Sequence, residues 1–159
     1  SPRKYFGIDA QLKIKHRNNI YTELRGELIG GTQTGTSSAS ETPTALLTGF
    51  DGFHVRNFFG GYFYFLQNIC SNQHQFIIKY DWYDPNTKVQ GKDIGVTGAG
   101  LSAANIKYST IGLGYIEHLS ENAKLVLYYA KVFNEKTALA GYTKDLADDV
   151  FTCRLQFRF

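Results

Sequence analysis

Apolar and polar residues alternate along most of this chain with a period of two, the period at which a strand exposes its opposite faces. The clearest case is the segment 150–159, in which apolar positions alternate with polar ones: Phe151, Cys153, Leu155, Phe157 and Phe159 against Thr152, Arg154, Gln156 and Arg158. The same alternation runs through residues 5–16 and 74–83. The pattern predicts extended strands, each with one apolar face and one polar face.

Seven segments fit this description, and the connections between them alternate between short and long. The predicted strands are residues 5–16, 20–28, 53–66, 74–83, 106–117, 124–133 and 150–159. Short turns are predicted near residues 17–19, 68–72 and 119–122, and long loops at 30–48, 84–104 and 134–148. Short connections join antiparallel neighbours. The chain is therefore predicted to be all-β, a single antiparallel up-and-down domain over residues 1–159.

The composition supports strands and argues against several functional classes. Twelve Phe, eleven Tyr and sixteen Gly with only three Pro favour a β-rich chain. No run of about 18 apolar residues exists, so no transmembrane helix is predicted. The net charge of +3 is spread along the strands, which argues against nucleic-acid binding. Cys70 and Cys153 are predicted to be free thiols, and no residue spacing predicts a metal site or a cofactor.

The connections indicate a membrane protein. Short turns at one end and long loops at the other are typical of bacterial outer-membrane barrels. Aromatic residues near strand ends would suit the girdles at the membrane surface: these are Tyr5, Trp82, Tyr115, Phe133 and Phe159. We therefore expect a transmembrane β-barrel in the outer membrane, its apolar faces against lipid. A soluble lipocalin-like barrel that binds a ligand would have the same alternation with the faces reversed.

Seven is an odd number, whereas bacterial single-chain barrels normally have an even strand count. Two explanations are open: an eighth strand is hidden in the long segment 50–66, or the chain is the C-terminal part of a larger barrel. The sequence predicts seven to eight strands in either case.

Specific segments resemble known outer-membrane proteins. The terminal strand, which ends on Phe159, resembles the C-terminal recognition strand of that class, and this implies binding to the barrel-assembly machinery. The phrases KYDWYDPN (79–86), IGLGY (111–115) and NAKLVLYY (122–129) resemble the C-terminal half of phosphate-selective (O/P-type) porins. The resemblance implies a homotrimeric channel for anions, with phosphate as a solute.

With the apolar faces outward, the polar faces would line a pore and carry eight Lys or Arg against four Asp or Glu. A positive wall raises the local concentration of anions. We therefore predict a porin for passive diffusion of small solutes with a mild anion preference. The predicted pore-lining residues are Lys13, Lys15, Arg25, Arg56, Lys79, Arg154 and Arg158. Arg25, Lys79 and Arg154 are expected near mid-height.

Two other interpretations stay open for the polar face. Its cations could pair with Glu23, Glu27 and Asp81 and serve hydration only, as in a small non-conducting barrel with a structural or adhesive role. A barrel hydrolase would need a nucleophile beside a base. His54 is the one histidine expected on the polar face, and no Ser or acid is placed to join it. The sequence therefore does not predict an enzyme.

Overall fold

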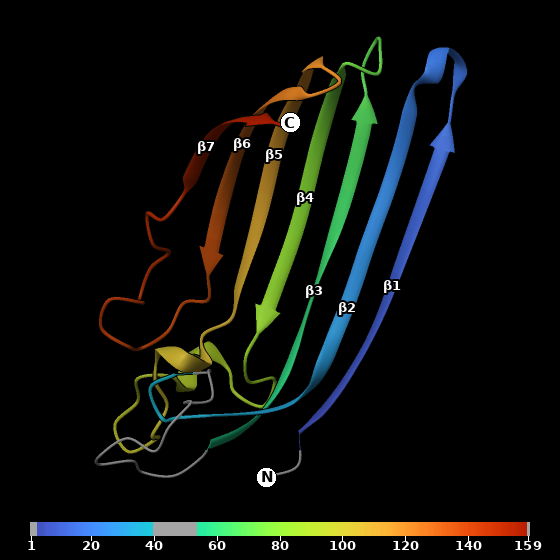
Figure 1. The fold of residues 1–159 in the computed structure, drawn as a ribbon. Helices are drawn as coiled ribbons and strands as arrows, with labels where there is room; N and C mark the ends of the chain where they lie inside the picture. The colour runs from blue at the N-terminus through green and yellow to red at the C-terminus, as the bar shows by residue number, and fades with distance from the viewer. Residues whose placement is uncertain (1–2, 40–53, 159) are drawn as a thin grey trace.

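The computed structural model describes residues 3–39 and 54–158, which form one antiparallel sheet of seven strands (Figure 1). The strands are β1 (Lys4–Lys15), β2 (Tyr21–Gly35), β3 (His54–Asn68), β4 (His74–Asp84), β5 (Tyr108–Ser120), β6 (Ala123–Asn134) and β7 (Val150–Phe157). Each strand pairs with its neighbours in the sequence, so the topology is up-and-down. The seven predicted strands and the all-β antiparallel class are confirmed.

The two ends of the sheet differ as predicted. The short turns β1–β2, β3–β4 and β5–β6 lie at one end together with the end of β7, and the long connections lie at the other end (Figure 1). Asn18 and Cys70 adopt φ values of 58° and 59° in two of the short turns. Asn is among the residues that tolerate this left-handed conformation best. We call the two ends the turn end and the loop end.

Strand β2 is longer than the sequence predicts. Residues 30–35 are rich in Gly and Thr and were expected to begin a loop, yet they pair with β3 up to Gly35, and residues 30–32 also pair with β1. The aromatic rings of Phe6 and Phe59 fold over Gly30, so a Cβ there would lie 2.7 Å and 3.1 Å from their ring carbons. These neighbours supply the apolar cover that the glycine lacks. The rest of that predicted loop, residues 40–53, lies outside the described residues.

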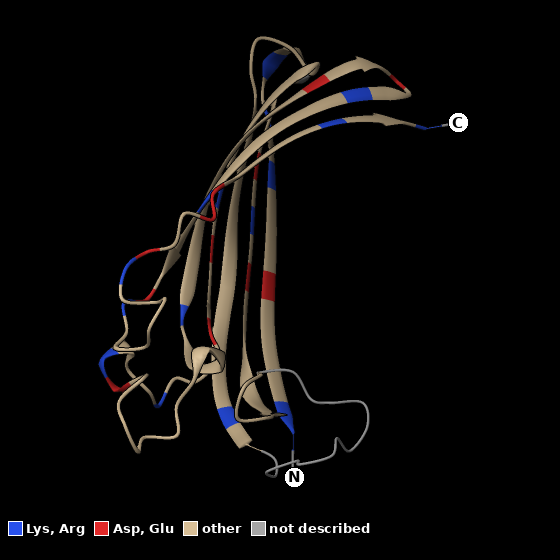
Figure 2. Ribbon diagram, turned by 90° about the vertical axis from the view of Figure 1, so that its left-hand side faces the viewer, with Lys and Arg blue, Asp and Glu red and all other residues tan. Residues whose placement is uncertain are grey.

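The sheet is curved but open. In the described residues β1 pairs only with β2, and β7 pairs only with β6, so the two edge strands do not meet. Figure 2 shows the curvature, with the strand ends nearest the C-terminus bent to one side. The chain does not close into the predicted barrel by itself.

The long loops at the loop end pack against each other. The β4–β5 connection contains two 3-10 helices, η2 (Gly91–Asp93) and η3 (Ala103–Asn105). Its Ile94 is fully buried, and the Ile94 carbonyl accepts a hydrogen bond from the Ala138 amide of the β6–β7 loop at 3.0 Å. The Gly91 amide donates to Glu135 Oε1 at 2.8 Å. A small buried cluster therefore lies between the loops, in addition to the buried strand residues Phe58, Leu66 and Ile77.

Candidate functional site

One face of the sheet is apolar across all seven strands, and we call it the apolar face. The strand register places Leu24 between Leu12 and Phe65, and Leu113 between Ile78 and Tyr129. Side chains on this face are unusually exposed, Phe6 by 66%, Ile8 by 70% and Phe151 by 67%. Within the described strands, its charged residues are confined to positions near strand ends: Lys4, Asp84, Glu117 and Lys131.

The dimensions of the apolar face match a membrane. In β1 it runs over residues 6–14, which is about 27 Å of strand at about 3.4 Å per residue. A tilt of about 40° reduces this to roughly 20 Å of depth, close to the apolar band of about 25 Å in outer-membrane barrels.

Most of the predicted girdle aromatics lie on this face. Trp82, Tyr115 and Phe133 are on the apolar face near its margins. The prediction for Tyr5 was wrong: it lies opposite Gly31 on the polar face, with its ring centroid 5.6 Å from that of Phe58. Tyr5 and Phe6 are adjacent in β1, so their side chains lie on opposite faces of the sheet. Phe159 lies outside the described residues.

The opposite face, the polar face, carries the predicted pore-lining residues. Across β1 to β4 it carries two ion pairs. Arg25 Nε donates to Glu23 Oε1 at 2.7 Å, and Lys79 Nζ lies 2.6 Å from Asp81 Oδ2. Gln11 also donates a hydrogen bond to Glu23. This half of the polar face is therefore hydrated but close to electrically balanced.

Two further lysines of the polar face differ in their surroundings. Lys13 Nζ lies 4.5 Å from the ring centroid of Tyr21, a cation–π contact. Lys15 is exposed at the turn end of β1, opposite Tyr21.

Arg56 is on the expected face but is 3% exposed. Its guanidinium donates to the carbonyl of Thr36 at 2.7 Å, to that of Ala39 at 3.2 Å and to Asn105 Oδ1 at 3.1 Å. Arg56 therefore fixes two loops against β3. Asn105, which also accepts from Asn86 Nδ2 at 2.9 Å, has no signal in the sequence because its partners are distant along the chain.

The register orders the cations along the sheet. Arg25 and Lys79 lie in one cross-strand row with Tyr64 between them. That row reaches β7 at Val150, four residues before Arg154 along the strand. Arg154 instead lies opposite Val126, closer to the turn end. The structure thus brings Arg25 and Lys79 together and places Arg154 elsewhere.

Arg154 belongs to a group with Lys124 and Arg158, which we call the basic cluster. Lys124 lies directly opposite Gln156, so Arg154 and Arg158 are its diagonal neighbours, at about 7–8 Å in a regular sheet. In the described part of the chain, none of the three cations forms an ion pair. Figure 2 shows positive segments on the strands that approach the C-terminus.

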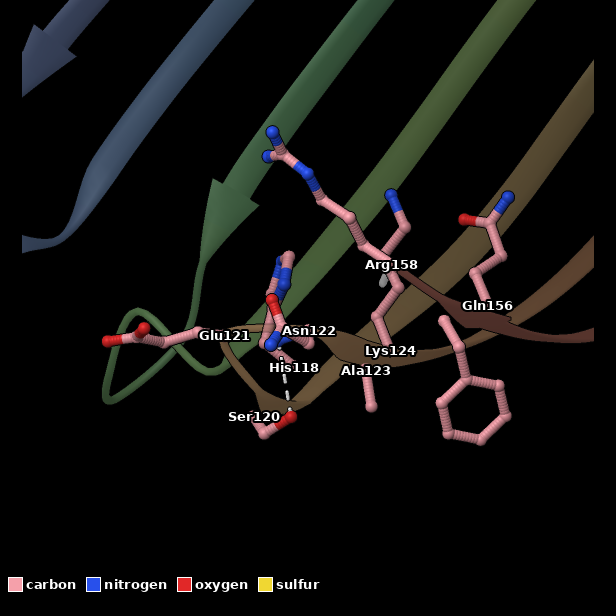
Figure 3. Close-up of a pocket in the computed structure, with 9 residues that line it drawn as sticks. His118, Ser120, Glu121, Asn122, Ala123, Lys124, Gln156 and Arg158 are labelled. Atoms are coloured by element: carbon pink, nitrogen blue, oxygen red, sulfur yellow. Dashed lines mark hydrogen bonds between the residues drawn. The ribbon is translucent and has the colours of Figure 1, made fainter.

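A cavity of about 370 Å³ lies beside the basic cluster, between the β5–β6 turn and the end of β7. Figure 3 shows Lys124, Gln156 and Arg158 extending to one side of the sheet, while Glu121 points away from them. His118, opposite Lys124, also lines the cavity. Ammonium, guanidinium and amide groups on one side of the sheet are the kinds of donor that an oxyanion needs.

Sequence reasoning recovered only part of this cavity. It named Arg154 and Arg158 as pore-lining residues but did not group them with Lys124, because grouping needs the register across β6 and β7. His118 and Gln156 were not selected at all. The sequence offered one signal for them: both occupy polar-face positions of strands that flank a short turn.

Other chemistries find little support in residues 3–39 and 54–158. No group of three or more His, Cys, Asp or Glu there could hold a metal ion. None of the helices found there is long and apolar enough to cross a membrane. Cys70 and Cys153 are free, as predicted, and both are exposed.

Comparison with known proteins identifies no relative: the chain matches no protein family model, no curated protein and no solved structure. The resemblance to phosphate-selective porins therefore stays a prediction. Any function has to be proposed from the physical properties of the two faces.

Proposed function

We propose that this sheet forms part of the wall of a bacterial outer-membrane channel through which small solutes diffuse passively, with a mild preference for anions. The observation that carries the proposal is the contrast between its faces. An exposed apolar face spans every strand, and behind it lies a polar face on which cations outnumber acids. A wall of this kind separates lipid from a watery passage.

The apolar face supports the membrane part of the proposal. Contiguous apolar surface on this scale is unfavourable in water and promotes association. Lipid covers it without cost. Strand edges within lipid have to be paired, because their amide and carbonyl groups find no water there. The sheet would therefore sit in a closed barrel, with further strands between β7 and β1.

The distribution of burial favours this orientation over a lipocalin-like one. A soluble ligand-binding barrel would bury its apolar face inside. In this sheet the buried large apolar residues of the strands, Phe58, Leu66 and Ile77, lie on the polar face, and loops pack against that face at Arg56. The polar face is therefore the better candidate for the interior.

The anion preference rests on the basic cluster. Because the charges of β1 to β4 largely cancel, the net positive potential of the polar face comes from Lys124, Arg154 and Arg158. Unpaired cations along a narrow passage lower the barrier for anions. Arginine binds phosphate with two parallel hydrogen bonds, which makes phosphate a reasonable solute to test.

The proposal includes two partners that the sequence resemblance implies. The segment 150–159 would be read by the barrel-assembly machinery, and the channel would assemble as a homotrimer. A non-conducting structural or adhesive barrel is the second candidate, and the pairs Arg25–Glu23 and Lys79–Asp81 favour it.

Bilayer recordings test the proposal. The closed barrel that contains this sheet, purified in detergent and inserted in a planar bilayer under a KCl gradient, should give a zero-current potential that favours chloride. Replacing Lys124, Arg154 and Arg158 by Gln should remove that preference, whereas Lys144→Gln in an exposed loop should not. A preference for potassium would refute the anion part, and absence of current would favour the non-conducting barrel. Full solubility without detergent, with a bound apolar ligand, would refute the membrane part.

A further inference from the structure

A row of aromatic rings crosses the polar face at the loop end, away from the basic cluster. The ring centroids of Tyr5 and Phe58 are 5.6 Å apart, those of Phe58 and Tyr83 are 6.0 Å apart, and those of Tyr83 and Tyr108 are 5.8 Å apart. The four residues come from β1, β3, β4 and β5. The channel function uses none of these rings.

The middle of the row is buried, and its two ends are exposed to solvent. Phe58 is 6% exposed, whereas Tyr108 is 42% exposed and Tyr5 is exposed as well. Gln33 Nε2 donates to the Tyr83 hydroxyl at 2.9 Å, which fixes the position of that ring. The exposed Tyr108 ring therefore stands against a rigid aromatic neighbour.

A cavity of about 180 Å³ lies where the row ends. The cross-strand row Tyr83, Tyr108 and Asn134 forms its floor. The loop residues that complete it are Pro85, Ala103, Ala104, Ile106 and Tyr142. Its volume is well below the range of about 300–1,000 Å³ that is usual for drug-sized ligands, so it suits a single small ring.

The lining selects the chemistry of the occupant. It contains no Lys, Arg, Asp or Glu, so it offers no partner for a charged solute. Tyrosine rings provide flat apolar surface with a hydroxyl at the edge, and Asn134 adds an amide. A neutral sugar ring has the matching properties, because its C–H groups form a flat apolar face and its hydroxyl groups lie around the rim.

We propose that the cavity beside Tyr83 and Tyr108 binds one ring of a neutral sugar. Tyr108, the exposed ring at this end of the row, would stack on the sugar. The inference goes beyond the anion channel, because it assigns a second class of solute to a different part of the polar face.

Calorimetric titration of the detergent-folded chain with glucose and with maltotriose tests the proposal. We expect both to bind, because one ring of either sugar fits the cavity. Tyr108→Leu should weaken binding about tenfold, and Tyr108→Phe, which keeps the ring, should restore most of it. Tyr80→Leu is the matched control, because Tyr80 is comparably exposed but lies on the apolar face. The fluorescence of Trp82, the one tryptophan of the chain, verifies that each variant folds.

Several outcomes would overturn the proposal. These are absence of binding to either sugar, equal binding by Tyr108→Leu, or a loss caused by Tyr80→Leu. Binding that is lost in Lys124→Gln would place the sugar at the basic cluster and would also refute it. Because the titration needs no ion flow, a chain that conducts anions but binds no sugar would refute this inference alone.

Discussion

Placing an arginine at the centre of the apolar face is the sharpest test of what covers that face. Leu113 lies in the middle strands of the sheet, flanked by Ile78 and Tyr129, and is 46% exposed. Glu117, four residues along β5, marks the margin of the apolar face. Four residues span about 14 Å of strand, or roughly 10 Å of depth at a tilt of about 40°. On the other side, Lys131 lies opposite Ile111, two residues from Leu113, so the charge of Leu113→Arg would lie about 7 Å of strand, or roughly 5 Å of depth, inside the nearer margin.

The expected cost follows from that depth. An arginine near the bilayer midplane of a barrel costs about 2–4 kcal/mol, and one near the membrane surface costs about 0–1 kcal/mol. Leu113 lies between these limits, so for Leu113→Arg we expect a loss of about 1–2 kcal/mol in the free energy of unfolding from lipid vesicles, equivalent to roughly 5- to 30-fold in the folding constant. Trp82 fluorescence during denaturant titration measures it.

Thr110→Arg is the matched control. Thr110 lies on the same strand but on the polar face, opposite Asp81, so an arginine there meets water and a carboxylate. We expect a change within about 0.5 kcal/mol. The reasoning is refuted if Leu113→Arg is tolerated as well as Thr110→Arg, because an exposed position in water would give that result.

Three further predictions concern other parts of the sheet. Gly31→Ala should lower the free energy of unfolding by at least about 2 kcal/mol, because its Cβ would lie 1.9 Å from a backbone oxygen of β1. Gly26→Ala should cost much less, because the nearest atom to its Cβ would be 3.4 Å away, and urea midpoints measure both variants. Arg56→Met should free the loops that it anchors, so hydrogen exchange should accelerate at residues 36–39 and 102–105, and unchanged protection would contradict the anchor role. In vesicles, Cys153 on the apolar face should react with membrane-permeant maleimides only, and Cys70 in its turn should also react with charged ones; rapid labelling of Cys153 by a charged reagent would contradict lipid contact.

Alternation predicted the strands well because every second side chain of each strand belongs to one chemically uniform face. The same alternation correctly predicted which cations lie on the polar face: Lys13, Lys15, Arg25, Arg56, Lys79 and Arg154. The ion pairs Arg25–Glu23 and Lys79–Asp81 join residues two positions apart on one face. Their pairing could therefore be predicted from the sequence as the alternative to unpaired pore-lining cations.

The parts that the sequence did not predict depend on register and on loop contacts. The β5–β6 pairing shifts between His118 and Ser120, and this shift decides which residue of β6 faces which of its neighbours. No local pattern reports such a shift. Arg56 was predicted to line the pore because its loop partners are distant along the chain and approach it only in the folded structure. The extension of β2 through Gly30 depended on aromatic rings from two other strands.

The odd strand count has a geometric consequence for assembly. Because neighbours alternate in direction, β1 and β7 both run from the loop end to the turn end. Joining these edges directly, in one molecule or in a ring of identical copies, would create a parallel seam. Pairing each edge with its own symmetry mate would instead turn one copy upside down relative to the membrane. A fully antiparallel barrel that contains this sheet therefore needs an odd number of additional strands, and the first to pair with β7 has to run from the turn end to the loop end.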